Sequence, residues 1–177
     1  MSKNKNSKIK WVITVTFLAF FISLLSLVLL SLAGFVLTVV VSFLLLFIAI
    51  GIVFDMVGVA VTSTDEEPLH AMSSKKIKGA KKAVSFKKNA DKVSSFCNDV
   101  IGDICGIVSG SAGVTIATSL SEKLNTSVLY TGLVITALTA ALTIGGKAFF
   151  KSIAIKNSNQ IVHMTAKVLS IFEKKKK

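Results

Sequence analysis

Long apolar runs alternate with lysine-rich polar segments along this chain of 177 residues. The first run extends from Trp11 to Val61, is almost continuously apolar and is broken by Ala33 and Gly34. At ~1.5 Å per residue, one helix of that length would far exceed a hydrocarbon core of ~30 Å, so the run must fold back on itself. The pattern predicts four transmembrane helices, at about residues 11–32, 36–61, 98–119 and 128–146.

These spans predict an all-α integral membrane protein. Apolar residues make up 52% of the chain and the mean hydropathy is +0.72, values typical of membrane proteins rather than of soluble domains. Residues 1–35 are expected to form a basic N-terminus and an extra transmembrane helix, and residues 36–177 the other three spans and a tail. The first span also resembles a secretory signal peptide with a small-residue cleavage site at residues 31–33. It is longer than the ~7–15 apolar residues usual there, which favours an uncleaved signal anchor.

Charge is distributed unevenly between the polar segments. All 21 positively charged residues are lysines, and all but Lys123 lie in the N-terminus, in the segment 62–96 or in the tail 147–177. Because lysine-rich segments remain on the cytoplasmic side, this asymmetry predicts a multi-pass protein of the cell membrane with both termini in the cytoplasm. The net charge of +12 does not indicate nucleic-acid binding, since no stacking aromatic pattern accompanies the lysines and arginine is absent.

The polar segment 62–96 is expected to form a basic helical loop at the inner membrane surface. Thr64 and Glu67 have the spacing of a capping box. Lysines between residues 75 and 92 are interleaved with apolar side chains, as in a helix that lies on a membrane. Two interpretations stay open for this lysine surface: it binds anionic lipid headgroups, or it is a solvated face without a specific partner.

Three carboxylates, Asp55, Asp99 and Asp103, lie in or at the ends of the predicted spans. A charged side chain there costs roughly 2.5–3.5 kcal/mol on insertion scales, so it normally has a partner and a function. Gly51 and Gly58 share a helical face with Asp55, at i−4 and i+3, and small residues let a second helix approach closely. We therefore expect Asp55 to face the helix bundle.

The third predicted span combines carboxylates with small residues. Gly102, Gly106 and Gly110 form a repeated seam that predicts helix packing. Oxygen ligands from aspartate, serine and backbone carbonyls suit a hard cation such as magnesium, whereas Asp99 and Asp103 also have the position of residues that open a helix.

The remaining polar residues do not indicate an enzyme. There is no nucleophile–base pair or phosphate-binding loop, and His70 and His163 are isolated. Cys97 and Cys105 have the surroundings of buried thiols rather than of a zinc site. Lys147 follows two glycines at the end of the fourth span, where it either extends to the membrane edge or pairs with a carboxylate.

Three short stretches match one known pattern in order and spacing. Residues 54–60 are Phe-Asp-Met-Val-Gly-Val-Ala, residues 102–103 are Gly-Asp, and residues 146–154 are Gly-Lys-Ala-Phe-Phe-Lys-Ser-Ile-Ala. They resemble the transmembrane domain of the cyclin-M/CorB/CorC family of magnesium transporters and exporters, which has Phe-Ser-x-x-Glu-x-Ala, Gly-Asn and Gly-Glu-x-x-Pro-Lys-(Thr/Ser)-x-Ala at these places. The similarity covers roughly residues 36–170, including a linker-like stretch at 78–83.

The resemblance implies a homodimer of helical bundles that moves a divalent cation, magnesium or cobalt, bound near the inner half of the membrane. It also implies a three-helix core, with the first span as an extra helix, and a juxtamembrane helix at about 150–173. Residues 1–177 contain no pair of CBS nucleotide-binding modules, which usually follows in this family. A separate regulatory subunit is therefore one further expectation.

The chain departs from the family at the ion site itself. The family's Ser, two Asn and Glu correspond here to Asp55, Asp103, Ile107 and Lys147. With this resemblance, the candidate metal ligands are Asp55, Asp103, Gly102 and Ser109. Two hypotheses follow: Asp55 and Asp103 bind a divalent cation with Lys147 as an internal competitor, or Lys147 pairs with one carboxylate in place of the ion. The second hypothesis describes a non-transporting membrane scaffold or accessory subunit. A small pore-forming protein is a weaker third one.

Overall fold

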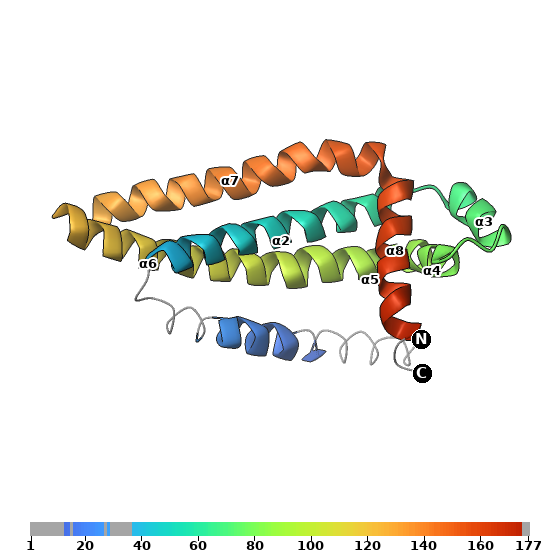
Figure 1. Cartoon of the computed structure of the whole chain (residues 1–177), viewed down its shortest axis with the longest axis horizontal. Helices are drawn as coiled ribbons and strands as arrows, with labels where there is room; N and C mark the ends of the chain where they lie inside the picture. Colours follow the sequence, from blue (N-terminus) through green and yellow to red (C-terminus); the bar gives the residue numbers. More distant parts are fainter. Residues whose placement is uncertain (1–12, 15, 27, 29–36, 175–177) are drawn as a thin grey trace. The chain divides into compact units, whose positions relative to one another are not determined.

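The structure, a computed structural model, describes residues 13, 14, 16–26, 28 and 37–174, and these are all-helical (Figure 1). An apolar helix, Thr16–Ser26, comes first. The later elements are the α-helices α2 (Leu37–Ser63), α3 (Glu66–Ser74), α4 (Ala80–Lys88) and α5 (Ala90–Ser95), the π-helix η1 (Phe96–Gly102), and the α-helices α6 (Asp103–Leu124), α7 (Val128–Lys156) and α8 (Ser158–Lys174).

Within the part of the chain that the structure describes, three helices are long and apolar enough to cross a membrane: Leu37–Ser63, Ala90–Leu124 and Val128–Lys156. Three of the four predicted spans are thereby confirmed as long apolar helices. The first predicted span lies partly outside the described residues, within which its helix is the shorter Thr16–Ser26. The proposed cleavage site at residues 31–33 lies outside them altogether.

The helices extend further into polar sequence than predicted. The third spanning helix begins at Ala90 rather than near residue 98, and α7 continues to Lys156 rather than ending near 146. The helix predicted to follow the last span therefore begins at Ser158, not near residue 150. The physical reason is that hydropathy marks where hydrocarbon ends, whereas a helix continues through alanine and lysine, which are good helix formers.

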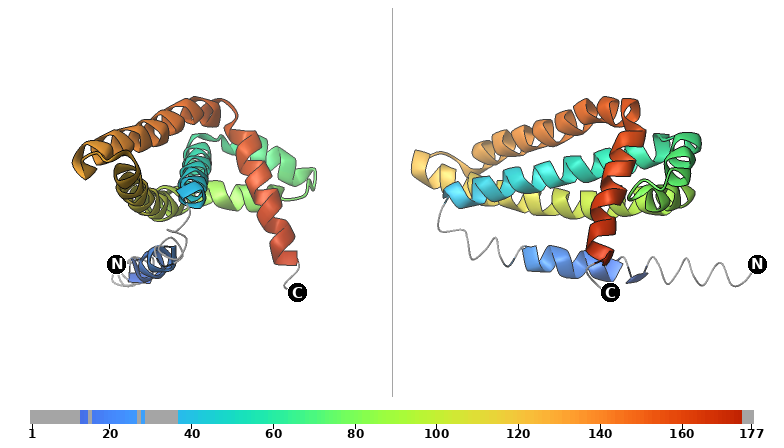
Figure 2. Two further views of the ribbon diagram at one scale, coloured as in Figure 1. Left: turned by 60° about the vertical axis from the view of Figure 1, so that its left-hand side comes forward. Right: turned by 45° about the vertical axis from the view of Figure 1, so that its right-hand side comes forward.

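The chain divides into two compact units, of which the first comprises Met1–Gly51 and Asp103–Leu142. In this unit the first half of α2, α6 and most of α7 lie side by side (Figures 1 and 2). A Cβ atom on Gly51 would lie 3.1 Å from Cys105 Cβ, and one on Gly113 would lie 3.6 Å from Ile135 Cγ2. The contact at Gly51 is tight, so a small residue lets α2 and α6 approach closely there, whereas the contact at Gly113 is of ordinary van der Waals length.

The second unit comprises Ile52–Gly102 and Thr143–Lys177. It contains the predicted basic helical loop, which is present as α3, α4 and α5, and α4 packs against both α3 and α8. Gly79 precedes α4 with φ 88°, and a Cβ there would lie 2.7 Å from Lys167 Cα, so glycine is needed at this contact. The buried core of this unit consists of Ala60, Val61, Leu69, Ala83, Ala154, Val162 and Ala166.

Side-chain hydrogen bonds in this unit join residues that are far apart in the sequence. The Thr64 hydroxyl donates to the Asn159 side-chain oxygen, and Lys87 Nζ donates to the Thr62 carbonyl at 3.0 Å. The capping box predicted at Thr64 is wrong: Asp65 is the N-cap residue of α3 and makes no side-chain capping bond. Thr64 instead continues the last turn of α2, since its backbone amide bonds Ala60, and this directs its hydroxyl to α8.

We expect Leu69→Ala to lower the stability of the second unit strongly. Leu69 has no exposed surface and packs in the core of the unit, and removing such a side chain costs about 2–5 kcal/mol through lost burial and the remaining cavity. Thermal unfolding of the purified protein in detergent measures the effect, with Ile77→Ala as control because Ile77 is 41% exposed. Equal melting temperatures for the two variants would contradict this account of the core.

Candidate functional site

An ion pair joins two of the long apolar helices within the second unit. Lys147 Nζ on α7 lies 3.5 Å from Asp55 Oδ1 on α2, and the side chains are 33% and 19% exposed. Gly146 makes this approach possible, because a Cβ there would overlap the Ile52 side chain, one turn before Asp55. Of the two pairings predicted for Lys147, the structure contains the one with Asp55.

The charges of this pair depend on each other. A carboxylate inside an apolar segment needs a compensating positive charge, and removing one partner of a buried pair costs about 3–5 kcal/mol because the other charge is left unpaired. Lys147 is the ion-pair partner of Asp55 among the described residues. A charged ammonium has only donors, so it cannot be a metal ligand, but it supplies the positive charge that a bound cation would supply.

The π-helical turn η1 forms the third side of the site. A Cβ on Gly102 would lie 3.8 Å from Lys147 Nζ and 3.7 Å from the Cys97 carbonyl oxygen, so the ammonium group lies beside a residue without a side chain. Single π-helical turns within α-helices are rare and are frequent at functional sites, because they shift side chains and free backbone groups. Gly102 is thus the second predicted metal ligand that lies beside Lys147.

Sequence reasoning missed Asn98, which η1 directs toward α2. Its side-chain oxygen is buried and has no hydrogen-bond partner among the described residues, whereas its amide nitrogen donates to Ser94 Oγ at 3.4 Å. The oxygen lies against Gly58, at the place where a Cβ would otherwise be. A buried carbonyl without a donor costs about 1–3 kcal/mol, so an acceptor of this kind calls for a cation or a donor. In the sequence, the position of Asn98 four residues before Gly102 was the feature that could have indicated that it belongs to the same site.

The other two predicted ligands lie in the first unit. Asp103 is exposed as the first residue of α6, and Ser109 is buried and donates to the Gly106 carbonyl at 3.1 Å. Their part in an ion site stays a prediction. Among the described residues, no three histidine, cysteine, aspartate or glutamate side chains gather as a metal-binding group.

Asp99 and the glycine seam of the third predicted span differ in how far the structure bears on their predicted roles. Asp99 does not open a helix, because α5 already begins at Ala90; its carboxylate accepts a hydrogen bond from Ser95. Gly106 and Gly110 have no described atom within 4 Å of an added Cβ, whereas Gly58 is in tight contact. The packing role proposed for this seam stays a prediction.

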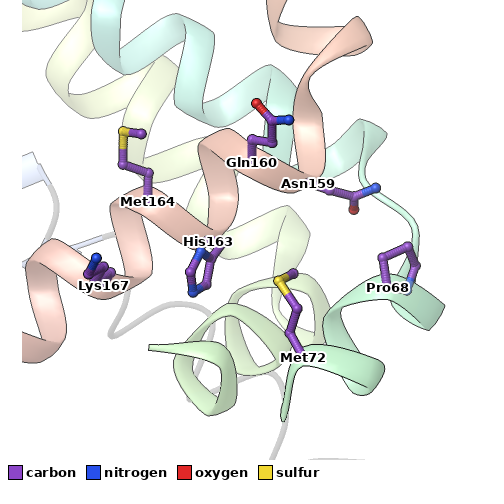
Figure 3. A pocket seen from close by; sticks show the side chains of 7 residues that line it. All are labelled: Pro68, Met72, Asn159, Gln160, His163, Met164 and Lys167. Atoms are coloured by element: carbon purple, nitrogen blue, oxygen red, sulfur yellow. The ribbon is translucent and has the colours of Figure 1, made fainter. Parts of the chain in front are cut away.

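A groove lies between α3 and α8 in the second unit (Figure 3). The groove has a volume of about 490 Å³ and no acidic residue in its lining, so it lacks the carboxylates that a divalent cation prefers. His163 borders it and contacts the Lys78 carbonyl oxygen at 3.1 Å. Its lining residues are Pro68, Met72, Asn159, Gln160, His163, Met164 and Lys167.

A comparison with known families agrees with the sequence resemblance. The family profile described as "Cyclin M transmembrane N-terminal domain" matches residues 40–174, which include Asp55, Asn98, Gly102 and Lys147. Neither the curated proteins nor the solved structures gave a match to the chain.

A double-mutant cycle measures the Asp55–Lys147 pair. We expect Asp55→Asn and Lys147→Met each to destabilise the protein, and the double variant to be less destabilised than the sum, with a coupling energy of about 0.5–3 kcal/mol. Thermal unfolding in detergent or lipid vesicles is the measurement, and Lys151→Met, one turn further on and exposed, is the matched control. Strictly additive effects would show that the two charges do not interact.

A glycine pair tests the contact between α2 and η1. Gly58→Ala should lower the melting temperature, because its methyl group displaces the Asn98 carboxamide, and overpacking costs about 1–3 kcal/mol. Gly106→Ala, which meets no described atom, should leave stability unchanged or raise it slightly. Adding Asn98→Ala should rescue Gly58→Ala. If Gly58→Ala is as stable as Gly106→Ala, the close contact is absent.

Proposed function

The chain belongs to the cyclin M transmembrane domain family, and from this membership we propose that it carries a divalent cation across the membrane. Magnesium is the first candidate substrate, because the family is associated with magnesium transport, and cobalt is the second. The observation that carries the proposal is Asp55, a carboxylate within an apolar helix whose charge is balanced, among the described residues, by the Lys147 ammonium group.

In this proposal the cation binds where Lys147 now neutralises Asp55. The Asp55 carboxylate, the Asn98 side-chain oxygen and the Gly102 carbonyl supply hard oxygen ligands, which suit magnesium. Asp103, the first residue of α6, is a further candidate carboxylate for the ion. Each arriving ion displaces the Lys147 ammonium from Asp55, so Lys147 acts as a tethered competitor that lowers affinity and favours release of the ion.

The setting of this activity is part of the proposal. We place the protein in the cell membrane with both termini in the cytoplasm, since the lysine-rich segments favour that side. A homodimer, regulated by a separate subunit, is the assembly that fits the family resemblance. None of the proposed roles requires enzymatic chemistry.

The 3.5 Å distance between Lys147 and Asp55 favours a second candidate function. If the ammonium group never leaves the carboxylate, the pair replaces the ion permanently. The bundle would then be a non-transporting scaffold or accessory subunit that presents its lysine-rich surface to lipids or to a partner protein. The two candidates differ in one property, namely whether a divalent cation can exchange with Lys147.

Ion flux into vesicles that contain the full chain separates these functions. We expect magnesium-dependent flux that Asp55→Asn abolishes, since it removes the charge that attracts the ion. Lys147→Gln should lower the half-saturating magnesium concentration by about tenfold, equivalent to ~1.4 kcal/mol of removed competition. Lys151→Gln is the matched control.

The scaffold function predicts a different set of results. Neither the wild-type protein nor Lys147→Gln would then carry magnesium, cobalt or manganese above empty vesicles. Asp103→Ala serves as a further variant: a flux that falls with it supports a second carboxylate on the path of the ion. Absence of flux in every variant, with folded protein confirmed by circular dichroism, would overturn the transport proposal.

A further inference from the structure

The groove between α3 and α8 is a cavity that the proposed ion site does not use (Figure 3). Its volume of about 490 Å³ lies within the range of roughly 300–1,000 Å³ that is common for small-molecule pockets. A molecule of metabolite size can therefore enter it. The lining includes the ammonium group of Lys167 and, among the described residues, no aspartate or glutamate.

Three polar side chains form one row along the groove. Asn159, His163 and Lys167 recur every four positions on α8, so they share one face of the helix. In Figure 3, Asn159 points toward α3 and His163 points to the side of α3 and α4. Gln160 and Met164 point to the other side of α8 and only border the groove. The row is thus the polar wall of the groove.

The hydrogen bonds that this row already makes decide what it offers to a ligand. The Asn159 side-chain oxygen accepts from the Thr64 hydroxyl, so the amide N–H groups of Asn159 are left to donate. His163 Nε2 lies 3.1 Å from the Lys78 carbonyl oxygen, which can only accept, so Nε2 carries a hydrogen and Nδ1 is left for a ligand. The Lys167 ammonium has three donors and no acceptor. This wall therefore suits a ligand rich in acceptor atoms.

The opposite wall of the groove is apolar. Pro68 and Met72 line it from α3, one helical turn apart, and the Met72 thioether points toward α8 in Figure 3. Methionine is flexible and polarizable, and its sulfur makes favourable contacts with flat rings. A ligand that fills the groove therefore needs an apolar part as well as an acceptor-rich group.

The charges around the groove indicate the end at which an anion binds. The first turn of α3 is acidic, with Glu66 and Glu67, and this is the Pro68 end of the groove. The turn that follows α3 is basic, since it has three lysines within residues 75–78. Gly79, which ends this turn, lies against the backbone of Lys167, because a Cβ there would be 2.7 Å from Lys167 Cα. An anion is therefore repelled at the first end and attracted at the second.

We propose that this groove binds an organic phosphate, with the phosphate group at Lys167 and His163. The apolar part of the molecule lies against Met72 and Pro68. A phosphate fits better than a carboxylate because it has more oxygen atoms to accept from several donors, and lysine is a common phosphate binder. The phosphate belongs either to a soluble metabolite or to a phospholipid headgroup. The site is separate from the ion pair, so the inference does not depend on ion transport.

Calorimetric titration of the full chain in non-ionic detergent tests the site. The probe is phenyl phosphate, which joins a phosphate group to a flat apolar ring and should bind. Lys167→Gln should weaken its binding by at least about tenfold, because a hydrogen bond between charged groups is lost. Lys156→Gln is the matched control, since Lys156 is also exposed but does not line the groove, and it should bind as the wild type does. Circular dichroism confirms that each variant is folded.

Two further probes test the two parts of the ligand. Benzoate, which carries a carboxylate on the same ring, and inorganic phosphate, which lacks the ring, should each bind more weakly than phenyl phosphate. Absence of phenyl phosphate binding, equal affinity of the wild type and Lys167→Gln, or equally tight binding of benzoate would overturn the proposal.

Competition against phenyl phosphate separates the two sources of the phosphate. If short-chain phosphatidic acid displaces phenyl phosphate at a lower concentration than adenosine monophosphate does, the groove holds a lipid headgroup. The reverse order supports a soluble metabolite. Displacement by neither compound would contradict a site for organic phosphates.

Discussion

A negative charge on an apolar helix is the constraint on which the other features of this protein depend. Asp55 lies within α2, a helix with the length and composition of a membrane span, and the Lys147 ammonium 3.5 Å away balances it. Gly146 lets α7 come close enough for that contact, and Gly102 leaves space beside the ammonium. Since either charge alone would be costly, α2 and α7 are coupled at this contact by electrostatics as well as by packing.

The π-helical turn η1 gives the same region its polar oxygen atoms. It brings Asn98 against Gly58 and leaves the amide oxygen buried without a hydrogen-bond donor among the described residues. A folded protein keeps few such groups, because each one lowers stability. The Asn98 oxygen is therefore free to accept a hydrogen bond or to bind a cation. That is the physical link between the local geometry and the proposed magnesium transport.

The sequence predicted the class of fold and part of the site. Hydropathy found the three long spans, and short motifs around Asp55, Gly102 and Lys147 indicated the family. Asn98 was not predicted, because a π-helical turn has no hydropathy signal. The start of α5 and the end of α7 were not predicted either, because hydropathy marks only the apolar part of a helix. Thr64 was misinterpreted as a cap because its partner, Asn159, is 95 residues away. Local spacing cannot anticipate a contact of that range.

Cation transport as proposed requires that the Lys147 ammonium and a divalent cation compete for Asp55. Reductive methylation of the reconstituted protein, followed by mass spectrometry of each lysine, measures how accessible the amine is with and without magnesium. Competition predicts that saturating magnesium increases methylation of Lys147 and leaves that of Lys151 unchanged, because the ion releases the amine from the carboxylate. Unchanged methylation of Lys147 in magnesium would contradict the claim and leave the pair as a permanent structural link.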